Sequence, residues 1–173
     1  MLLFRHTITL PYNGIFRKLY ACCFITTLSA LIQALLEDYI YYSDKSIADY
    51  TLILNVLSMI FFYTHILCCT LSAFYECSVL NIKVNETLIK LLLNVPAVIA
   101  IVTISLNPFL STVFYIDPVL GYQRRAFLIL LYLVALYYLI FTLVIIIAYG
   151  QNIRRDKRIA FTLLPFIPFI GTV

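Results

Sequence analysis

Long uncharged stretches dominate the pattern of hydrophobic and polar positions along this chain. Five of them stand out: residues 19–36, 51–75, 91–106, 126–149 and 159–173. A helix needs about 20 residues, at 1.5 Å per residue, to cross roughly 30 Å of hydrocarbon. The first four stretches therefore predict four membrane-spanning helices.

The fourth and fifth stretches differ most in how well they fit a membrane. Residues 126–149 contain 16 Leu, Ile, Val or Phe residues, each of which favours insertion near the centre of a helix. Residues 159–173 number only 15 and contain Pro165 and Pro168. Either the chain is cut short there, or this end only dips into the membrane.

The continuous apolar runs favour helices over the strands of a membrane barrel, in which apolar and polar residues alternate. We expect an all-α fold, a polytopic transmembrane helical bundle with four full spans and a fifth partial or truncated one. No stretch rich in Gly, Ser or Pro forms a flexible linker. Residues 1–173 are therefore expected to form a single domain.

Composition agrees with this interpretation and excludes several classes of protein. Of the 173 residues, 64% are apolar and 12% are charged, whereas a soluble domain is roughly 45 to 50% apolar and about 25% charged. The expected partner of the surface is the lipid bilayer. A disordered tail, a disulfide-stapled secreted scaffold and a nucleic-acid-binding module are all excluded.

The basic residues predict how the chain is oriented. With the N-terminus placed in the cytoplasm, nine of the twelve Lys and Arg residues fall on the cytoplasmic side and three outside. Such a bias is typical of the cytoplasmic loops of membrane proteins. We expect a multi-pass protein of the cell (plasma) membrane with a cytoplasmic N-terminus.

The residues that carry chemistry in enzymes are sparse here. The four glycines do not form a phosphate-binding or dinucleotide-binding motif, and the sequence has no H-E-x-x-H or G-x-S-x-G. The five cysteines lack the C-x-x-C spacing of a zinc or redox site and are interpreted as packing residues. We expect no catalytic residue, no metal site and no cofactor, so the chain is not expected to be an enzyme.

Three polar residues inside the predicted spans, Asn55, His65 and Asn94, need a separate interpretation. An ionisable or polar side chain at that depth is a functional hypothesis by default. However, no second histidine or acid lies at helical spacing from His65, and a buried Asn commonly bonds across a helix interface. We favour structural roles for all three and keep a substrate pathway as the alternative.

The stretch 105–141, SLNPFLSTVFYIDPVLGYQRRAFLILLYLVALYYLIF, is more specific than apolar filler. It resembles the N-terminal membrane region of bacterial diguanylate cyclases of the GGDEF type and, more distantly, the seven-helix input region of some histidine kinases. LPYNGIFRKL (10–19) and LNVLSMIFFYTHI (54–66) are similar to the same regions in the same order. Ala126 departs from the glycine usual in those proteins, and the chain contains neither a GGDEF sequence nor a kinase histidine box.

The resemblance implies a membrane sensory or input module of a bacterial signalling protein that lacks its catalytic output domain. The implied partners are a cytoplasmic diguanylate cyclase or kinase output domain, with a homodimer as an open alternative. A transporter or channel component and a non-catalytic membrane interaction protein are the other functions to consider.

Within that interpretation, we place the sensing surface on the outer loop that joins the third and fourth spans. Two neighbouring arginines there could hold a carboxylate or a phosphate. Alternatively, the acid and the arginines of the loop pair with one another or with lipid headgroups. The candidate signal-sensing residues are Asn107, Pro108, Asp117, Gly121, Tyr122, Arg124 and Arg125.

Overall fold

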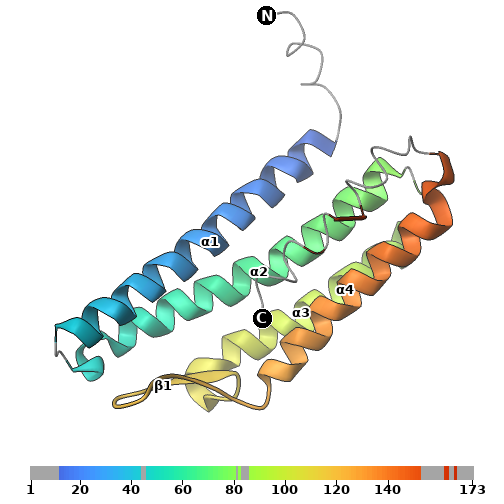
Figure 1. Cartoon of the computed structure of the whole chain (residues 1–173). Helices are drawn as coiled ribbons and strands as arrows, with labels where there is room; N and C mark the ends of the chain where they lie inside the picture. Colours follow the sequence, from blue (N-terminus) through green and yellow to red (C-terminus); the bar gives the residue numbers. More distant parts are fainter. Residues whose placement is uncertain are drawn as a thin grey trace, which may run out of the picture.

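The computed structural model describes residues 12–43, 46–80, 82, 86–152, 162–163 and 166. Four of its helices are long and apolar enough to cross a membrane, as predicted, and they lie side by side in Figure 1. The chain is therefore a multi-pass membrane protein. The helices and strands, in chain order, are α1 (Tyr12–Tyr42), η1 (Ile47–Tyr50), α2 (Thr51–Val79), α3 (Glu86–Leu110), β1 (Phe114–Asp117), β2 (Gly121–Arg124), α4 (Leu128–Tyr149) and η2 (Gly150–Asn152).

Three helices are longer than the uncharged runs that predicted them. Helix α1 continues past Glu37, helix α2 continues past Glu76, and helix α3 continues past Asn107 to Leu110. Charged and polar side chains at these points do not end a helix, because the hydrogen bonds of a helix are made by its backbone. The prediction for α4 differs by only two residues at its start.

The expectation of a purely helical fold was wrong in one place. Strands β1 and β2 form an antiparallel hairpin between α3 and α4, with Phe114 opposite Arg124 and Ile116 opposite Tyr122. The hairpin lies at one end of the helices in Figure 1, which we call the hairpin end. The fifth predicted span, 159–173, lies almost wholly outside the described residues.

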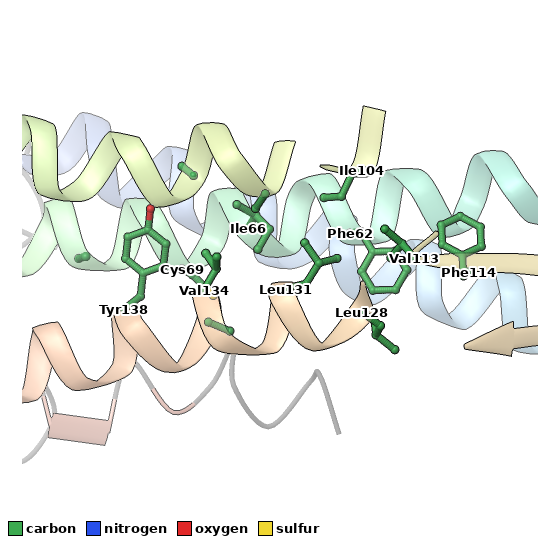
Figure 2. Close-up of a cluster of buried hydrophobic side chains, with 14 of the residues drawn as sticks. Phe62, Ile66, Cys69, Ile104, Val113, Phe114, Leu128, Leu131, Val134 and Tyr138 are labelled. Carbon is green, nitrogen blue, oxygen red and sulfur yellow. The ribbon is translucent and has the colours of Figure 1, made fainter. Parts of the chain in front are cut away.

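Helix α2 contacts each of the other three long helices. Its apolar side packs with α3, α4 and the hairpin around Phe62, Ile66, Leu131 and Tyr138, as Figure 2 shows. Alanines lie among the buried residues of α2, α3 and α4 and let the backbones approach closely. Among the described residues of α1, only Ile40 belongs to the buried part of this core.

A proline inside α3 is compensated by α4. Pro96 has no N–H, so the carbonyl of Leu92, four residues earlier, lacks its helical donor. The Tyr137 hydroxyl donates to that carbonyl at 3.1 Å, and the Tyr138 hydroxyl donates to the carbonyl of Leu93. In lipid no water can satisfy such a group. The two tyrosines therefore satisfy α3 backbone carbonyls at its proline.

The contact between α1 and α2 is different in kind, because polar and sulfur-containing side chains form much of it. The hydroxyl oxygens of Thr26 and Thr64 are 2.8 Å apart, and the sulfurs of Cys23 and Cys68 are 3.6 Å apart. Polar side chains of this kind are common between helices in lipid, where the hydrophobic effect does not drive association.

Candidate functional site

A buried asparagine joins the hairpin to the end of α3. Ser111 adopts a left-handed conformation (φ 47°) and its N–H donates to the Asn107 carbonyl at 2.7 Å, which turns the chain. The Asn107 side chain accepts hydrogen bonds from the N–H groups of Val113 (2.8 Å) and Phe114 (3.2 Å) and donates to the Phe114 carbonyl (3.1 Å). Asn107 is 3% exposed. It positions the hairpin and does not line either cavity described below, and the adjacent Pro108 does not line them either.

Asp117 and Gly121 shape the turn of the hairpin. One Asp117 carboxylate oxygen accepts hydrogen bonds from the N–H groups of Val119 (2.8 Å) and Leu120 (2.9 Å). These backbone donors, that of Leu120 first, lower the pKa of Asp117 below its ordinary value. Gly121 has φ +73°, a conformation that side chains disfavour. Both residues are therefore accounted for by turn geometry.

The two neighbouring arginines point to opposite faces of the hairpin. Side chains alternate along a strand, so Tyr122 and Arg124 share the face of Phe114 and Ile116, which are buried against the helices. The Arg125 guanidinium lies over the Tyr115 ring, 4.2 Å from its centroid, on the other face. The sequence alone does not show which arginine faces the helices, whereas the alternation of side chains along the strand places Arg124 on that face and Arg125 on the other.

An aromatic stack fixes the inward face of the hairpin against α2. The ring of Phe114 stacks on Phe62, with centroids 5.5 Å apart, and on Tyr122, with centroids 5.7 Å apart. Burial raises the pKa of Tyr122 to about 12, so its hydroxyl stays protonated at neutral pH. Tyr122 is thus a rigid, neutral wall of the adjoining cavity.

A cavity of about 290 Å³ lies at the hairpin end, where the hairpin meets three helices. This volume lies just below the roughly 300–1,000 Å³ found for small-molecule sites. Three of its walls are helical and the fourth is β2. Its lining residues are Ala30, Gln33, Ala34 and Glu37 of α1, Ser58, Phe61 and Phe62 of α2, Tyr122 and Arg124 of β2, and Tyr132 of α4.

The polar groups of this cavity, which we call the hairpin-end cavity, form a directed chain. The Ser58 hydroxyl donates to the Gln33 side-chain oxygen at 3.1 Å, and the Gln33 amide nitrogen donates to a Glu37 carboxylate oxygen at 3.0 Å. Within the described chain, no salt bridge joins Glu37 to Arg124, although both line the cavity. The cavity therefore presents one negative and one positive group, each with hydrogen-bonding capacity left over.

A second, larger hollow of about 670 Å³ adjoins the first. The two hollows share Glu37 and Tyr122. Ile40, Ile47 and Leu54 line the second hollow together with the tip of the hairpin, and Asp38 adds an acid beside Glu37. A ligand held by the charges of the first cavity can place an apolar part in the second.

The three intramembrane polar residues do not converge. Asn55 donates to the Thr51 carbonyl of its own helix at 2.9 Å, and the side of α3 that carries Asn94 is exposed. His65 is buried, stacks on Phe61 and has its Nε2 3.7 Å from the Cys69 sulfur. No described group of three His, Cys, Asp or Glu is arranged to hold a metal ion.

Sequence reasoning missed the helical walls of the cavity and one buried acid. The i, i+4 spacing of Gln33 and Glu37 was a usable signal, because it places both side chains on one face of a helix. Glu76 was interpreted as the end of a span, but it lies inside α2 at 1% exposure. No described residue donates a hydrogen bond to either of its carboxylate oxygens.

Comparison of the chain with protein-family models, with curated proteins and with solved structures gives no match.

Proposed function

We propose that this chain is a membrane sensory or input module of the cell membrane, with a cytoplasmic N-terminus and the hairpin on the outer face. Its four spans form a bundle, and the hairpin-end cavity receives the signal. The resemblance to the input regions of GGDEF diguanylate cyclases and histidine kinases supports this proposal and suggests a cytoplasmic output domain as the partner. Two candidate sensing residues of the outer loop, Tyr122 and Arg124, line this cavity.

One observation carries the proposal: the cavity lies between α1, which contacts mainly α2, and the apolar core that α2, α3, α4 and the hairpin share. Glu37 and Gln33 belong to α1, which contributes little to the apolar core, whereas Tyr122, Arg124 and Tyr132 belong to the hairpin and α4. A ligand that contacts both walls binds two positions of α1 with different affinity. Such differential affinity is what shifts a population of conformations.

Oxidative cross-linking of native cysteines tests this coupling without an output domain. The sulfurs of Cys23 and Cys68 are 3.6 Å apart, and Cys23 lies 14 residues from Glu37, or roughly 21 Å along α1. In membranes treated with copper phenanthroline, Arg124→Ala is expected to change the rate of Cys23–Cys68 disulfide formation. A coupling of 0.5 to 2 kcal/mol corresponds to roughly two- to thirtyfold.

Arg125→Ala is the matched control, because it removes the same charge one residue away, on the opposite face of the hairpin. Its cross-linking rate should equal that of the wild type. Mass spectrometry of the linked peptides identifies the cysteines that reacted. Equal rates in the wild type and both variants would contradict the proposal.

A second candidate function, a transport component, is favoured by a different observation. Six buried residues of α2 recur at alternating spacings of four and three residues, which places them on one face: Ser58, Phe62, His65, Cys69, Ser72 and Glu76. Apart from Cys69, four of these six residues are polar or ionisable. No described residue hydrogen-bonds to the Ser72 hydroxyl or to the Glu76 carboxylate. Buried ionisable groups in a span commonly mark an ion pathway.

Proton flux into liposomes distinguishes the two functions. A transport component predicts flux driven by a pH gradient, and this flux should fall in Glu76→Gln and stay unchanged in Arg124→Ala. The sensory module predicts no flux above that of empty liposomes, together with the cross-linking difference described above.

A further inference from the structure

The hairpin-end cavity presents opposite charges that are not paired with each other. Glu37 comes from α1 and Arg124 from β2, and both line the same hollow of about 290 Å³. Arg124 is exposed and Glu37 is half-buried, and within the described chain no salt bridge joins them, so both charged groups are accessible to a ligand in the hollow. Placing opposite charges on separate walls leaves room for a ligand that carries both complementary charges.

Further contacts orient the negative side. Gln33 donates to Glu37 and accepts from Ser58 of α2, so the amide is held in one orientation. The carboxylate keeps acceptor sites for a primary ammonium group, which has three donors. On the positive side, the planar guanidinium of Arg124 can bind a carboxylate or a phosphate through two parallel hydrogen bonds.

The remaining surfaces indicate what lies between and beside those charges. Phe61, Phe62 and Tyr132 give the cavity aromatic walls, which accommodate the carbon atoms of a ligand. The adjoining hollow of about 670 Å³ shares Glu37 and Tyr122, and its apolar part is formed by Ile40, Ile47, Leu54, Val119 and Leu120, beside the further acid Asp38. The site thus offers an ammonium position, an anion position and an apolar extension.

We propose that the hairpin-end cavity binds a zwitterion that carries a primary ammonium group, an acidic group and an apolar part. The ammonium group pairs with Glu37, the carboxylate or phosphate pairs with Arg124, and the apolar part enters the second hollow. This inference rests on the proposed sensory function, since it names the class of signal. A free amino acid and the headgroup of phosphatidylethanolamine share this chemistry.

Binding of leucine and of phosphatidylethanolamine to the full chain tests the inference and separates the two sources. Equilibrium dialysis with labelled leucine measures the free source in phosphatidylglycerol nanodiscs. Native mass spectrometry with phosphatidylethanolamine added to the phosphatidylglycerol measures the lipid source. We expect one of the two to bind. For leucine, isoamylamine and 4-methylpentanoate serve as controls, because each keeps the isobutyl group and only one of the two charges.

Four single variants and one double variant make the test specific. Glu37→Gln and Arg124→Ala should each weaken binding about tenfold or more, because each removes a charge-assisted contact. Asp49→Asn and Arg125→Ala remove exposed charges that line neither hollow, so binding should remain within about twofold of the wild type. The exchange Glu37→Arg with Arg124→Glu should recover part of the binding, since a zwitterion can bind in the reversed orientation.

Two results would overturn the inference. One is that neither leucine nor phosphatidylethanolamine binds to the folded chain, as judged by circular dichroism and size exclusion. The other is that isoamylamine or 4-methylpentanoate binds as tightly as leucine. If zwitterions do not bind but Arg124→Ala still alters cross-linking at Cys23 and Cys68, the ligand class is wrong and the sensory function stands. If zwitterions bind without altering cross-linking, the sensory function is wrong.

Discussion

The two sides of α2 are built from different chemistry. Toward α3, α4 and the hairpin, α2 contributes Phe62, Ile66 and Ala73 to the apolar core. Toward α1 it presents hydroxyl and thiol groups, with short contacts at Thr64 and Cys68. Close packing of large and small side chains stabilises the core. Each hydrogen bond between membrane helices stabilises their association by only about 0.6 kcal/mol on average.

This difference indicates which part of the molecule can move. Buried rings join the hairpin to α2, the Asn107 side chain joins the hairpin to α3, and α3 and α4 share the apolar core with α2, so we treat these elements as one unit. Helix α1 touches that unit mainly through α2 and through the walls of the hairpin-end cavity. In our account α1 is the moving part, and the cavity is where a ligand acts on it.

Removal of the Asn107 side chain should produce the largest loss of stability, because this side chain joins the hairpin to the end of α3. Asn107→Ala deletes three hydrogen bonds to the backbone of the hairpin. At about 1 kcal/mol each, the free energy of unfolding in mixed micelles should fall by about 3 kcal/mol. Trypsin should also cleave the freed hairpin after Arg124 or Arg125. The exposed Asn94→Ala on the same helix is the control and should be nearly neutral.

Loss of the tyrosine hydroxyls on α4 should have the next largest effect. Tyr138→Phe leaves the buried Leu93 carbonyl without this donor and should cost about 1 kcal/mol. Tyr137→Phe should cost less, because its hydroxyl is partly exposed. In a Pro96→Ala background, the helix regains a backbone donor for Leu92, so Tyr137→Phe should become nearly neutral. An equal cost in both backgrounds would show that the hydroxyl does not compensate for the proline.

A change at the polar interface between α1 and α2 should have a smaller effect. Thr64→Val removes the contact with Thr26 and should lower the free energy of unfolding by about 0.6 kcal/mol. The same variant should increase alkylation of Cys23 in intact membranes, because α1 is held less firmly. A loss as large as that of Asn107→Ala would mean that the two sides of α2 are equally rigid.

The smallest expected effect concerns the turn of the hairpin and its pH dependence. The folded pKa of Asp117 lies below its ordinary value, which is near 3.9. The turn is therefore stabilised above that pH, and this contribution is lost as the pH falls toward the folded pKa. Amide exchange of Val119 and Leu120, corrected for intrinsic rates, should accelerate below about pH 4. Asp117→Asn should abolish this pH dependence.

The four long helices could be predicted from the sequence because a membrane imposes a simple length requirement on uncharged runs. The ends of the helices could not, since Glu37 and Glu76 sit within continuing helices. The hairpin was also missed, although residues 117–121 contain turn residues at each end. The two strands have only four residues each, which is too short for an alternation of apolar and polar residues to be recognised next to long apolar runs.

The candidate site was predictable only on its loop side. Tyr122 and Arg124 were among the residues expected to sense a signal, and they line the cavity. Asn107 and Asp117 have structural roles that depend on backbone geometry. Gln33, Glu37 and Ser58 could not be assigned to the cavity, because the sequence of one helix does not determine which of its residues meet the other helix.

The most direct test of the central claim is a comparison of two distances by pulsed electron paramagnetic resonance in a cysteine-free background. One pair of spin labels replaces Tyr41 on α1 and Val119 at the hairpin tip, and the other replaces Phe109 on α3 and Val119, all of which are exposed. We predict a broad distance distribution for the first pair that changes in Arg124→Ala, and a narrow, unchanged one for the second. Equally narrow distributions that Arg124→Ala leaves unchanged would contradict the account.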